Sequence, residues 1–157
     1  MPTITPNLWF DTQAEEAAQH YVSVFPNSEV RNVSRYGDAG PGETGTVLSV
    51  EFVLDGTPFI GINGGPMFTF SEAVSFAISC KDQDEVDYYW NALLAGGGEE
   101  SQCGWLKDRF GVSWQVVPAE MGEIMSNPDP EKAARTTQAM LGMRKLDIAA
   151  LRAAAEG

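Results

Sequence analysis

The side chains with the clearest chemical potential lie close together in one segment. Cys103, Lys107 and Arg109 fall within seven positions. A thiol becomes a good nucleophile when a nearby cation or helix N-terminus lowers its pKa. Cys103 is therefore the candidate catalytic residue, and the alternative is a small buried hydrophobic side chain. Cys80 ends an apolar stretch, where we expect it to pack in the core.

Metal chemistry has little support in the residue types. The chain has one histidine, His20, so a facial triad of two histidines and a carboxylate cannot form within one chain. We expect His20 to be partly exposed on a helix. Two cysteines are too few for a disulfide framework or a zinc cluster. We expect no bound metal and no cofactor.

One glycine-rich stretch has the spacing of a nucleotide-binding turn. Residues 40–45 read Gly-Pro-Gly-Glu-Thr-Gly and fit G-x-G-x-x-G. Common enzymes that use S-adenosylmethionine have such a turn between a strand and a helix of a parallel sheet. Here a strand-like stretch follows it, so we expect a loop that connects two strands.

Apolar periodicity predicts the elements of a first module over residues 3–63. Alternation and turn residues predict strands at 3–10, 28–36, 46–54 and 57–63. The spacing of Thr12 and Glu15 is that of a capping box, and an amphipathic helix follows. Residues 64–72 are expected to be a linker.

The same order recurs in a second module over residues 73–118. A strand is predicted at 74–80, a helix at 86–95, and two strands near 100–107 and 112–118. Asp82 and Glu85 repeat the cap pattern. The same number of positions, 70, separates Phe10 from Cys80, Thr12 from Asp82 and Glu15 from Glu85. Such an offset indicates an internal duplication.

Residues 119–157 form a C-terminal helical extension by composition. Asp129-Pro130 offers an N-cap followed by proline at the first helical position. Helices are expected at 130–142 and 147–156. They are rich in alanine, methionine and leucine, so we expect them to pack on the sheet or on a partner subunit, and we expect a homodimer.

The formal net charge of −12 excludes several partners. Phosphate backbones and anionic membrane surfaces repel such a chain, so we expect neither nucleic acid nor membrane as a partner. No apolar run is long enough to span a bilayer, and the first residues lack the features of a signal peptide. We expect a reducing, cytoplasmic environment and a neutral or cationic small organic ligand.

Three segments, at residues 6–10, 102–118 and 139–151, carry a family resemblance. They read PNLWF, QCGWLKDRFGVSWQVVP and AMLGMRKLDIAAL. They resemble the PhnB-like branch of the vicinal-oxygen-chelate superfamily, often labelled 3-demethylubiquinone-9 3-methyltransferase-like. The resemblance implies an α+β fold in which two βαβββ modules form a curved mixed sheet around a cavity, with the C-terminal helices added in a single domain of residues 1–157.

The resemblance also implies where ligands of the superfamily's metal would lie. The positions fall on Thr5, on Asn63 or Gly61, on Ser75 and on Gln115. Only Gln115 is a residue type that the superfamily uses as a ligand. Alternation along the strands adds Asn7 and Trp9 to the face of Thr5 and assigns Trp114 to the core, and helical spacing assigns Trp90 to the core. The expected cavity residues are Thr5, Asn7, Trp9, Asn63, Ser75, Trp105 and Gln115.

Three functions stay open at this point. The leading hypothesis is metal-independent binding of a small cationic or aromatic compound, as in bleomycin-resistance-like sequestration. The second is an enzyme without a bound metal that uses Cys103 or polar cavity residues. The third is a metal-dependent lyase or dioxygenase whose ligands lie elsewhere. The family label adds methyltransferase chemistry as a further alternative.

Overall fold

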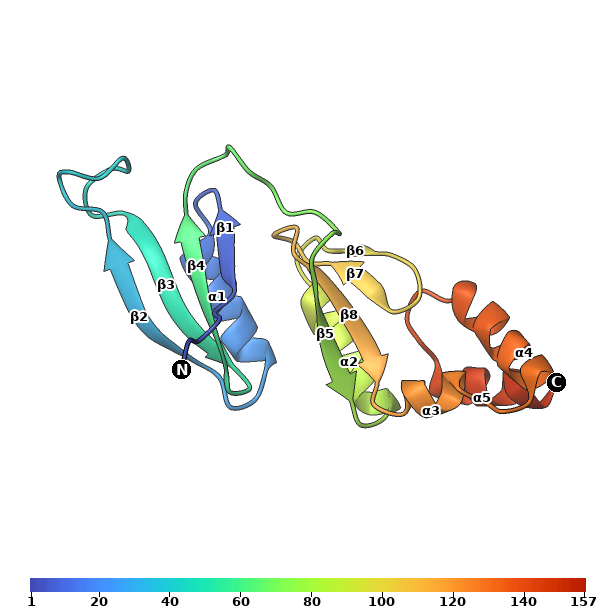
Figure 1. Cartoon of the computed structure of the whole chain (residues 1–157). Coiled ribbons are helices and arrows are strands. Elements are labelled where there is room, and N and C mark those ends of the chain that lie inside the picture. Colours follow the sequence, from blue (N-terminus) through green and yellow to red (C-terminus); the bar gives the residue numbers. More distant parts are fainter. The chain divides into compact units, whose positions relative to one another are not determined.

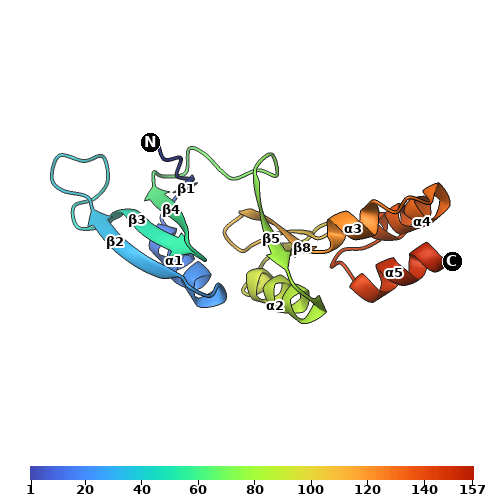
Figure 2. The ribbon, with the colours of Figure 1, turned by 60° about the horizontal axis from the view of Figure 1, so that its bottom comes forward.

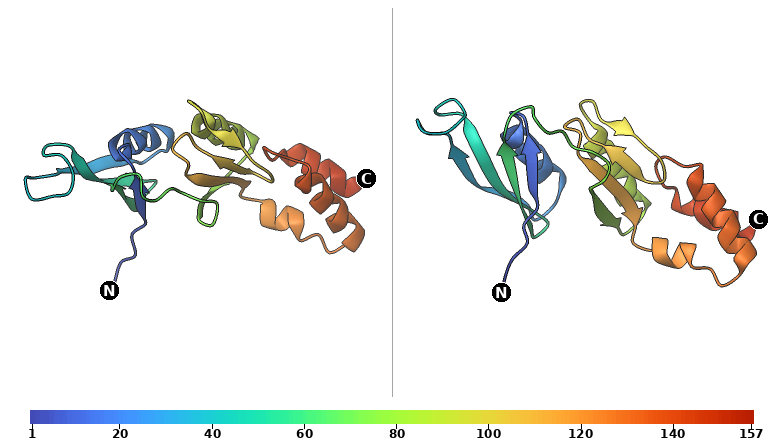
Figure 3. Two further views of the ribbon diagram at one scale, coloured as in Figure 1. Left: turned by 90° about the horizontal axis from the view of Figure 1, so that it is seen from above. Right: turned by 45° about the horizontal axis from the view of Figure 1, so that its top comes forward.

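The computed structural model describes residues 1–157, which divide into a first unit, Met1–Phe70, and a second unit, Ser71–Gly157. Each unit contains one four-stranded mixed sheet with a helix on one face (Figure 1; Figure 3). The expected α+β class and the two βαβββ modules are confirmed.

The first sheet is built from four strands in the order β1-β4-β3-β2. Strands β1 (Asn7–Phe10) and β4 (Thr57–Asn63) run parallel, while β3 (Val47–Leu54) is antiparallel to both β4 and β2 (Glu29–Arg35). The expected strand at 3–10 forms only from residue 7, after Pro6, which has no amide hydrogen for a ladder.

Helix α1 (Ala14–Val24) covers one face of this sheet because alanines allow a close approach. Ala14, Ala17 and Ala18 are fully buried. A Cβ added at Gly61 would lie 3.3 Å from the Ala14 Cβ, so glycine at this position of β4 leaves room for the first turn of the helix. Leu8 and Phe10 point to this helix side, as expected.

The capping box predicted at the start of α1 is wrong. The N-cap residue is Gln13, and no side chain on the N-terminal segment caps the helix. The Asn63 side chain takes that role from β4, because its Oδ1 accepts a 2.8 Å hydrogen bond from the Ala14 amide. A residue that is distant in the sequence, Asn63, therefore caps α1 in place of the predicted local residue, Thr12.

The glycine-rich stretch connects β2 to β3, as expected for a strand-connecting loop. The loop closes around Tyr36, since a Cβ at Gly40 or Gly42 would lie within 2.8 Å of the Tyr36 ring. The Tyr36 hydroxyl donates to the Asn63 carbonyl oxygen at 2.7 Å. The motif therefore has no strand-turn-helix geometry for a nucleotide.

The second sheet repeats the first in the order β5-β8-β7-β6. Strand β5 (Ser75–Cys80) runs parallel to β8 (Ser113–Pro118), and β7 (Trp105–Lys107) is antiparallel to both β8 and β6 (Glu99–Glu100). Helix α2 (Gln83–Leu94) covers one face (Figure 2). The Asp82 carboxylate caps this helix on the Glu85 amide at 2.9 Å, which confirms the second capping prediction.

The strand predicted near 100–107 is wrong in one respect, because a turn divides it into β6 and β7. Cys103 and Gly104 both have a positive φ, of 57° and 86°. A Cβ at Gly104 would lie 2.9 Å from both the Leu146 Cδ1 and the Val116 carbonyl oxygen, so glycine is required there for two reasons. A ladder cannot continue through this conformation.

The C-terminal extension contains α3 (Met121–Met125), α4 (Pro130–Leu141) and α5 (Ile148–Glu156). The two longer helices confirm the prediction, and α3 is additional. The segment Met143–Leu146, which we call the strap, ties α4 and α5 to the second module. Its Met143 and Arg144 carbonyl oxygens accept the amides of Cys103 and Gly104 at 2.9 and 2.8 Å. Leu146 is 2% exposed.

The helices are short relative to a lipid bilayer. None of them combines the length and the apolar character needed to cross one.

Candidate functional site

The open face of the second sheet, opposite α2, gathers three of the expected cavity residues. Trp105 pairs with Gln115 across β7 and β8, and Ser75 pairs with Ser113 across β5 and β8. Paired residues on neighbouring strands point to the same face. The Gln115 Nε2 donates to the Ser75 Oγ at 2.9 Å. Trp114 points to the other face and is 3% exposed, as expected.

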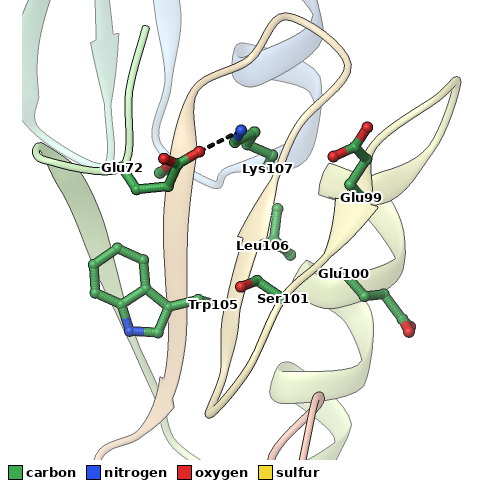
Figure 4. Close-up of a pocket in the computed structure, with 8 residues that line it drawn as sticks. Glu72, Glu99, Glu100, Ser101, Trp105, Leu106 and Lys107 are labelled. Carbon is green, nitrogen blue, oxygen red and sulfur yellow. Dashed lines mark ion pairs between the residues drawn. The ribbon is translucent and has the colours of Figure 1, made fainter.

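A small cavity lies at the β6–β7 side of this face. Its volume is about 180 Å³, and it is lined by Glu72, Glu99, Glu100, Ser101, Trp105, Leu106, Lys107 and Ser113. Figure 4 shows the Trp105 ring on one side and Lys107 reaching toward Glu72. Glu72 lies in the turn before β5, so a loop supplies one wall and the sheet supplies the others.

The ion pair of Lys107 and Glu72 dominates the electrostatics of the cavity. The two side chains remain 38% and 61% exposed. The hydrogen bond from Lys107, with its charge, lowers the pKa of Glu72, and the reciprocal bond raises the pKa of Lys107. Lys107 is therefore an ammonium at neutral pH and is not available as a general base.

Ser113 is the unusual polar group of this wall. The residue is 2% exposed, and its Oγ has no hydrogen-bonding partner. Buried hydroxyls nearly always have one, because an unpaired hydroxyl loses its bonds to water without compensation. Ser113 lies directly across from Lys107 in the β7–β8 register.

Glu100 has a structural task although it borders the cavity. It accepts the Trp90 indole Nε1 at 3.0 Å, and this bond is the main cause that lowers the pKa of Glu100. Arg144 of the strap lies 3.4 Å from its other oxygen. Glu72 and Glu99 therefore remain as the carboxylates on either side of Lys107.

The expected residues of the first module are mostly engaged in local contacts. Thr5 precedes β1, and its carbonyl oxygen accepts the Asn7 side chain at 2.9 Å. The Trp9 Nε1 donates to the Gly65 carbonyl oxygen at 2.9 Å, and its ring meets Phe68 edge-on at 5.0 Å. Asn7 is exposed. Their role in ligand binding stays a prediction.

Asn63 does not share the face of Asn7 and Trp9. It pairs with Phe10 in the parallel β1–β4 register, so its side chain lies on the helix side, as does Gly61. Both ends of its amide are used, since Nδ2 also donates to the Val47 carbonyl oxygen at 3.2 Å. The side chain positions the start of α1.

These positions do not fit a divalent metal. The Asn63 Oδ1 is occupied by a backbone amide, and Ser75 and Gln115 are bonded to each other. Hydroxyls and amides are weak neutral ligands for the metals of such sites. Neither unit gathers three His, Cys, Asp or Glu side chains in a group that could hold a metal.

Cys103 is not among the residues that line the cavity. Its sulfur lies 3.5 Å from the Met140 carbonyl oxygen, and its amide donates to the strap. The neighbouring cations point elsewhere: Lys107 pairs with Glu72, and the Arg109 guanidinium lies 4.6 Å from the centre of the Phe110 ring. The suggested activation of Cys103 has no support in this geometry.

The sequence did not point to Glu72, Glu99 or Ser113, and it pointed to Lys107 only as a cation near Cys103, not as a residue of the cavity wall. Lys107 and Ser113 could have been found, because each lies two positions from an expected residue on its own strand, Trp105 or Gln115. Glu72 is in the linker, which carries no periodic signal.

A larger cavity of about 770 Å³ lies in the first unit, between the glycine-rich loop and the start of α1. Asp11, Glu15, Glu16 and Glu43 line it, together with Arg35, Tyr36 and Asn63. Its charge is acidic, but it has no counterpart of the unpaired Ser113 hydroxyl. We therefore take the cavity of the second unit as the candidate site.

Two βαβββ modules with these strand orders define a glyoxalase/bleomycin-resistance fold. The family described as 3-demethylubiquinone-9 3-methyltransferase matches residues 2–117. The chain belongs to this PhnB-type family of the vicinal-oxygen-chelate superfamily.

Solved structures agree with this assignment. A PhnB protein from Bacillus cereus is 36% identical over 75% of this chain and 100% of its own, with a TM-score of 0.68. A protein from Pseudomonas aeruginosa is 20% identical over 75% of this chain and 98% of its own, with a TM-score of 0.62.

The fosfomycin resistance protein FosX from Listeria monocytogenes, in complex with Mn(II) and sulfate, is 15% identical over 79% of this chain and 94% of its own, with a TM-score of 0.51. FosX and the Pseudomonas protein share the fold alone with this chain. A search of curated proteins found no match.

Proposed function

We propose that the protein binds a small organic cation with an aromatic or apolar part, without covalent chemistry and without a bound metal. The observation that carries this proposal is the composition of the cavity wall in the second unit. The wall holds the Trp105 ring, one ammonium group, Lys107, and two carboxylates on either side of that ammonium, Glu72 and Glu99 (Figure 4).

The charge of the wall supports a cationic ligand. Carboxylates outnumber cations on the wall, and the whole chain carries a net charge of −12. A cation gains from this potential, and the face of an indole ring adds about 0.5–2 kcal/mol of cation–π attraction. An anion would be repelled by the same groups.

The volume sets the size of the recognised group. Sites for drug-sized ligands usually measure about 300–1,000 Å³. A cavity of about 180 Å³ suits a cationic head group, with the remainder of the ligand on the open face beside Trp105 and Gln115. The hydrogen-bonded Ser75 and Gln115 pair offers polar contacts there.

Calorimetric titration with benzyltrimethylammonium, benzylammonium and benzyl alcohol tests the proposal. The cations should bind more tightly than the neutral alcohol. Trp105→Ala should weaken cation binding by about twofold to thirtyfold, the equivalent of about 0.5–2 kcal/mol. Tyr88→Ala removes another partly exposed aromatic residue of the second unit, on α2, and serves as the control. Equal affinity for all three probes would refute the proposal.

We further propose that the protein is a homodimer in the cytoplasm. Both cysteines are free, as suits a reducing compartment. Several large apolar side chains are exposed, as suits a surface that a second copy covers.

A further inference from the structure

The unpaired hydroxyl of Ser113 narrows the class of ligand. It is buried on the cavity wall, and no protein group satisfies it. A group left in this state costs free energy in the empty protein, and a ligand that bonds to it recovers that cost. The ligand is therefore expected to carry a hydrogen-bonding group at this point.

The charges around Ser113 decide which kind of group that is. Glu72 and Glu99 lie on the two sides of Lys107 (Figure 4). Lys107 pairs with Ser113 in the β7–β8 register. A ligand group that enters here meets two carboxylates and one ammonium. This environment favours a cationic donor, for which the Ser113 oxygen acts as acceptor.

Lys107 itself occupies the place of such a donor. Its ammonium is bound by Glu72, yet both side chains remain partly exposed to water. Exposed ion pairs of this kind contribute little to stability, so a competing ammonium can exchange with Lys107 at small cost. Displacement of the Lys107 side chain would also leave more room beside Ser113, its cross-strand neighbour.

We infer that the ligand of this cavity is a protonated primary or secondary amine, whose ammonium group replaces that of Lys107 at Glu72 and donates a hydrogen bond to the Ser113 Oγ. The inference rests on the proposed function and specifies its ligand. A quaternary ammonium keeps the charge but has no N–H to donate, so Ser113 separates the two kinds of cation.

Calorimetric titrations of the full-length protein with benzylammonium and benzyltrimethylammonium test the inference. The wild type should bind benzylammonium about tenfold or more tightly than the quaternary cation, the effect of a hydrogen bond that involves a charged group. Ser113→Ala should remove most of this preference. Ser79→Ala, an exposed serine on the same face of β5, should retain it.

A second variant examines the exchange with Lys107. Lys107→Met removes the competing ammonium and should tighten benzylammonium binding, by up to about fivefold for the loss of an exposed pair. Weaker binding of benzylammonium to this variant would contradict the proposal that the ligand displaces the Lys107 ammonium.

The outcomes separate the two proposals. If both cations bind but Ser113→Ala keeps the preference, the inference is wrong and the proposed function stands. If neither cation binds, the proposed function fails and the inference fails with it.

Discussion

The unpaired hydroxyl of Ser113 lowers the stability of the folded protein. Its hydroxyl lies in a wall where strand and loop side chains exclude water, and no partner replaces the water. We predict that Ser113→Ala raises the free energy of unfolding by about 1 kcal/mol, because the unpaired group is removed without loss of a bond. Urea denaturation measures the change. Ser79→Ala should stay within about 0.5 kcal/mol of the wild type. Destabilisation by Ser113→Ala would show that the hydroxyl has a partner in solution.

Cys80 makes the fold less stable as the pH rises into the alkaline range. Burial, aided by the charges of Glu85 and Asp82, raises the pKa of its thiol to about 11. An unfolded cysteine ionises near pH 8.5, as an approximate reference value. Between these values the unfolded chain loses a proton that the folded chain keeps, so stability falls as pH rises.

The expected loss of unfolding free energy is about 1–3 kcal/mol between pH 8.5 and 11. The comparison of wild type with Cys80→Ala by denaturation at several pH values isolates it, because tyrosines and lysines titrate in both proteins. Below pH 8 the two proteins should show parallel pH profiles. If the unfolding free energies of the two proteins changed equally with pH above pH 9, the result would contradict the raised pKa of Cys80.

At the scale of elements, the turn between β6 and β7 joins the second module to the strap. Gly104 combines a positive φ with contacts to Leu146 and Val116. We predict that Gly104→Ala destabilises the protein by about 2–4 kcal/mol, from backbone strain and overpacking together. Gly45→Ala is the matched control, since Gly45 has a φ of 88° and open space around it. It should cost about 1 kcal/mol. Thermal denaturation of both variants gives the comparison. An equal loss of stability in the two variants would mean that the contacts of the added Cβ with Leu146 and Val116 contribute nothing.

Local sequence signals predicted most elements of both modules. Asp82 caps α2 and Asp129 caps α4, because in each case acceptor and donor lie within three residues of each other. The failures occur where a distant group competes. At the start of α1, Asn63 caps the helix in place of the predicted Thr12, although Asn63 lies far along the chain. The break at Cys103 reflects the docking of the strap, which no periodicity records.

The candidate site was predictable where alternation governs it. Trp105, Gln115 and Ser75 share a face because each is on a strand of the second sheet. Alternation applied two residues further along β7 and β8 would have added Lys107 and Ser113. Asn63 was misplaced because its face depends on the register of β1 and β4, which sequence spacing does not fix. Glu72 belongs to a linker whose path depends on tertiary contacts.

At the scale of the whole molecule, the family match ends at residue 117, so the C-terminal helices lie outside it. They still contribute to the core of the second unit. Leu151 of α5 is fully buried in this core, and Leu146 of the strap, which joins α4 to α5, is almost fully buried. Gln83 of α2 joins this contact, since its side chain bonds to the Leu146 carbonyl oxygen and to the Ile148 amide.

The distribution of exposed apolar residues bears on the proposed homodimer. Ile4, Met67, Phe68 and Val74 are 94, 78, 57 and 67% exposed, whereas the C-terminal helices contribute only Leu141 to this group. We predict a dimer of the 17.0 kDa chain by sedimentation equilibrium at micromolar concentration. Phe68→Glu should weaken it by at least tenfold, and Leu141→Glu should not. A monomer in the wild type, or the reverse sensitivity, would contradict the prediction.

The strap has a consequence for hydrogen exchange. The amides of Cys103 and Gly104 are bonded to the Met143 and Arg144 carbonyl oxygens, not to a strand of the sheet. Their deuterium uptake therefore measures how often residues 143–146 detach, while amides within β8 measure the opening of the sheet itself. One labelling experiment would thus give two opening free energies for one unit, and would show whether the extension unfolds with the module or before it.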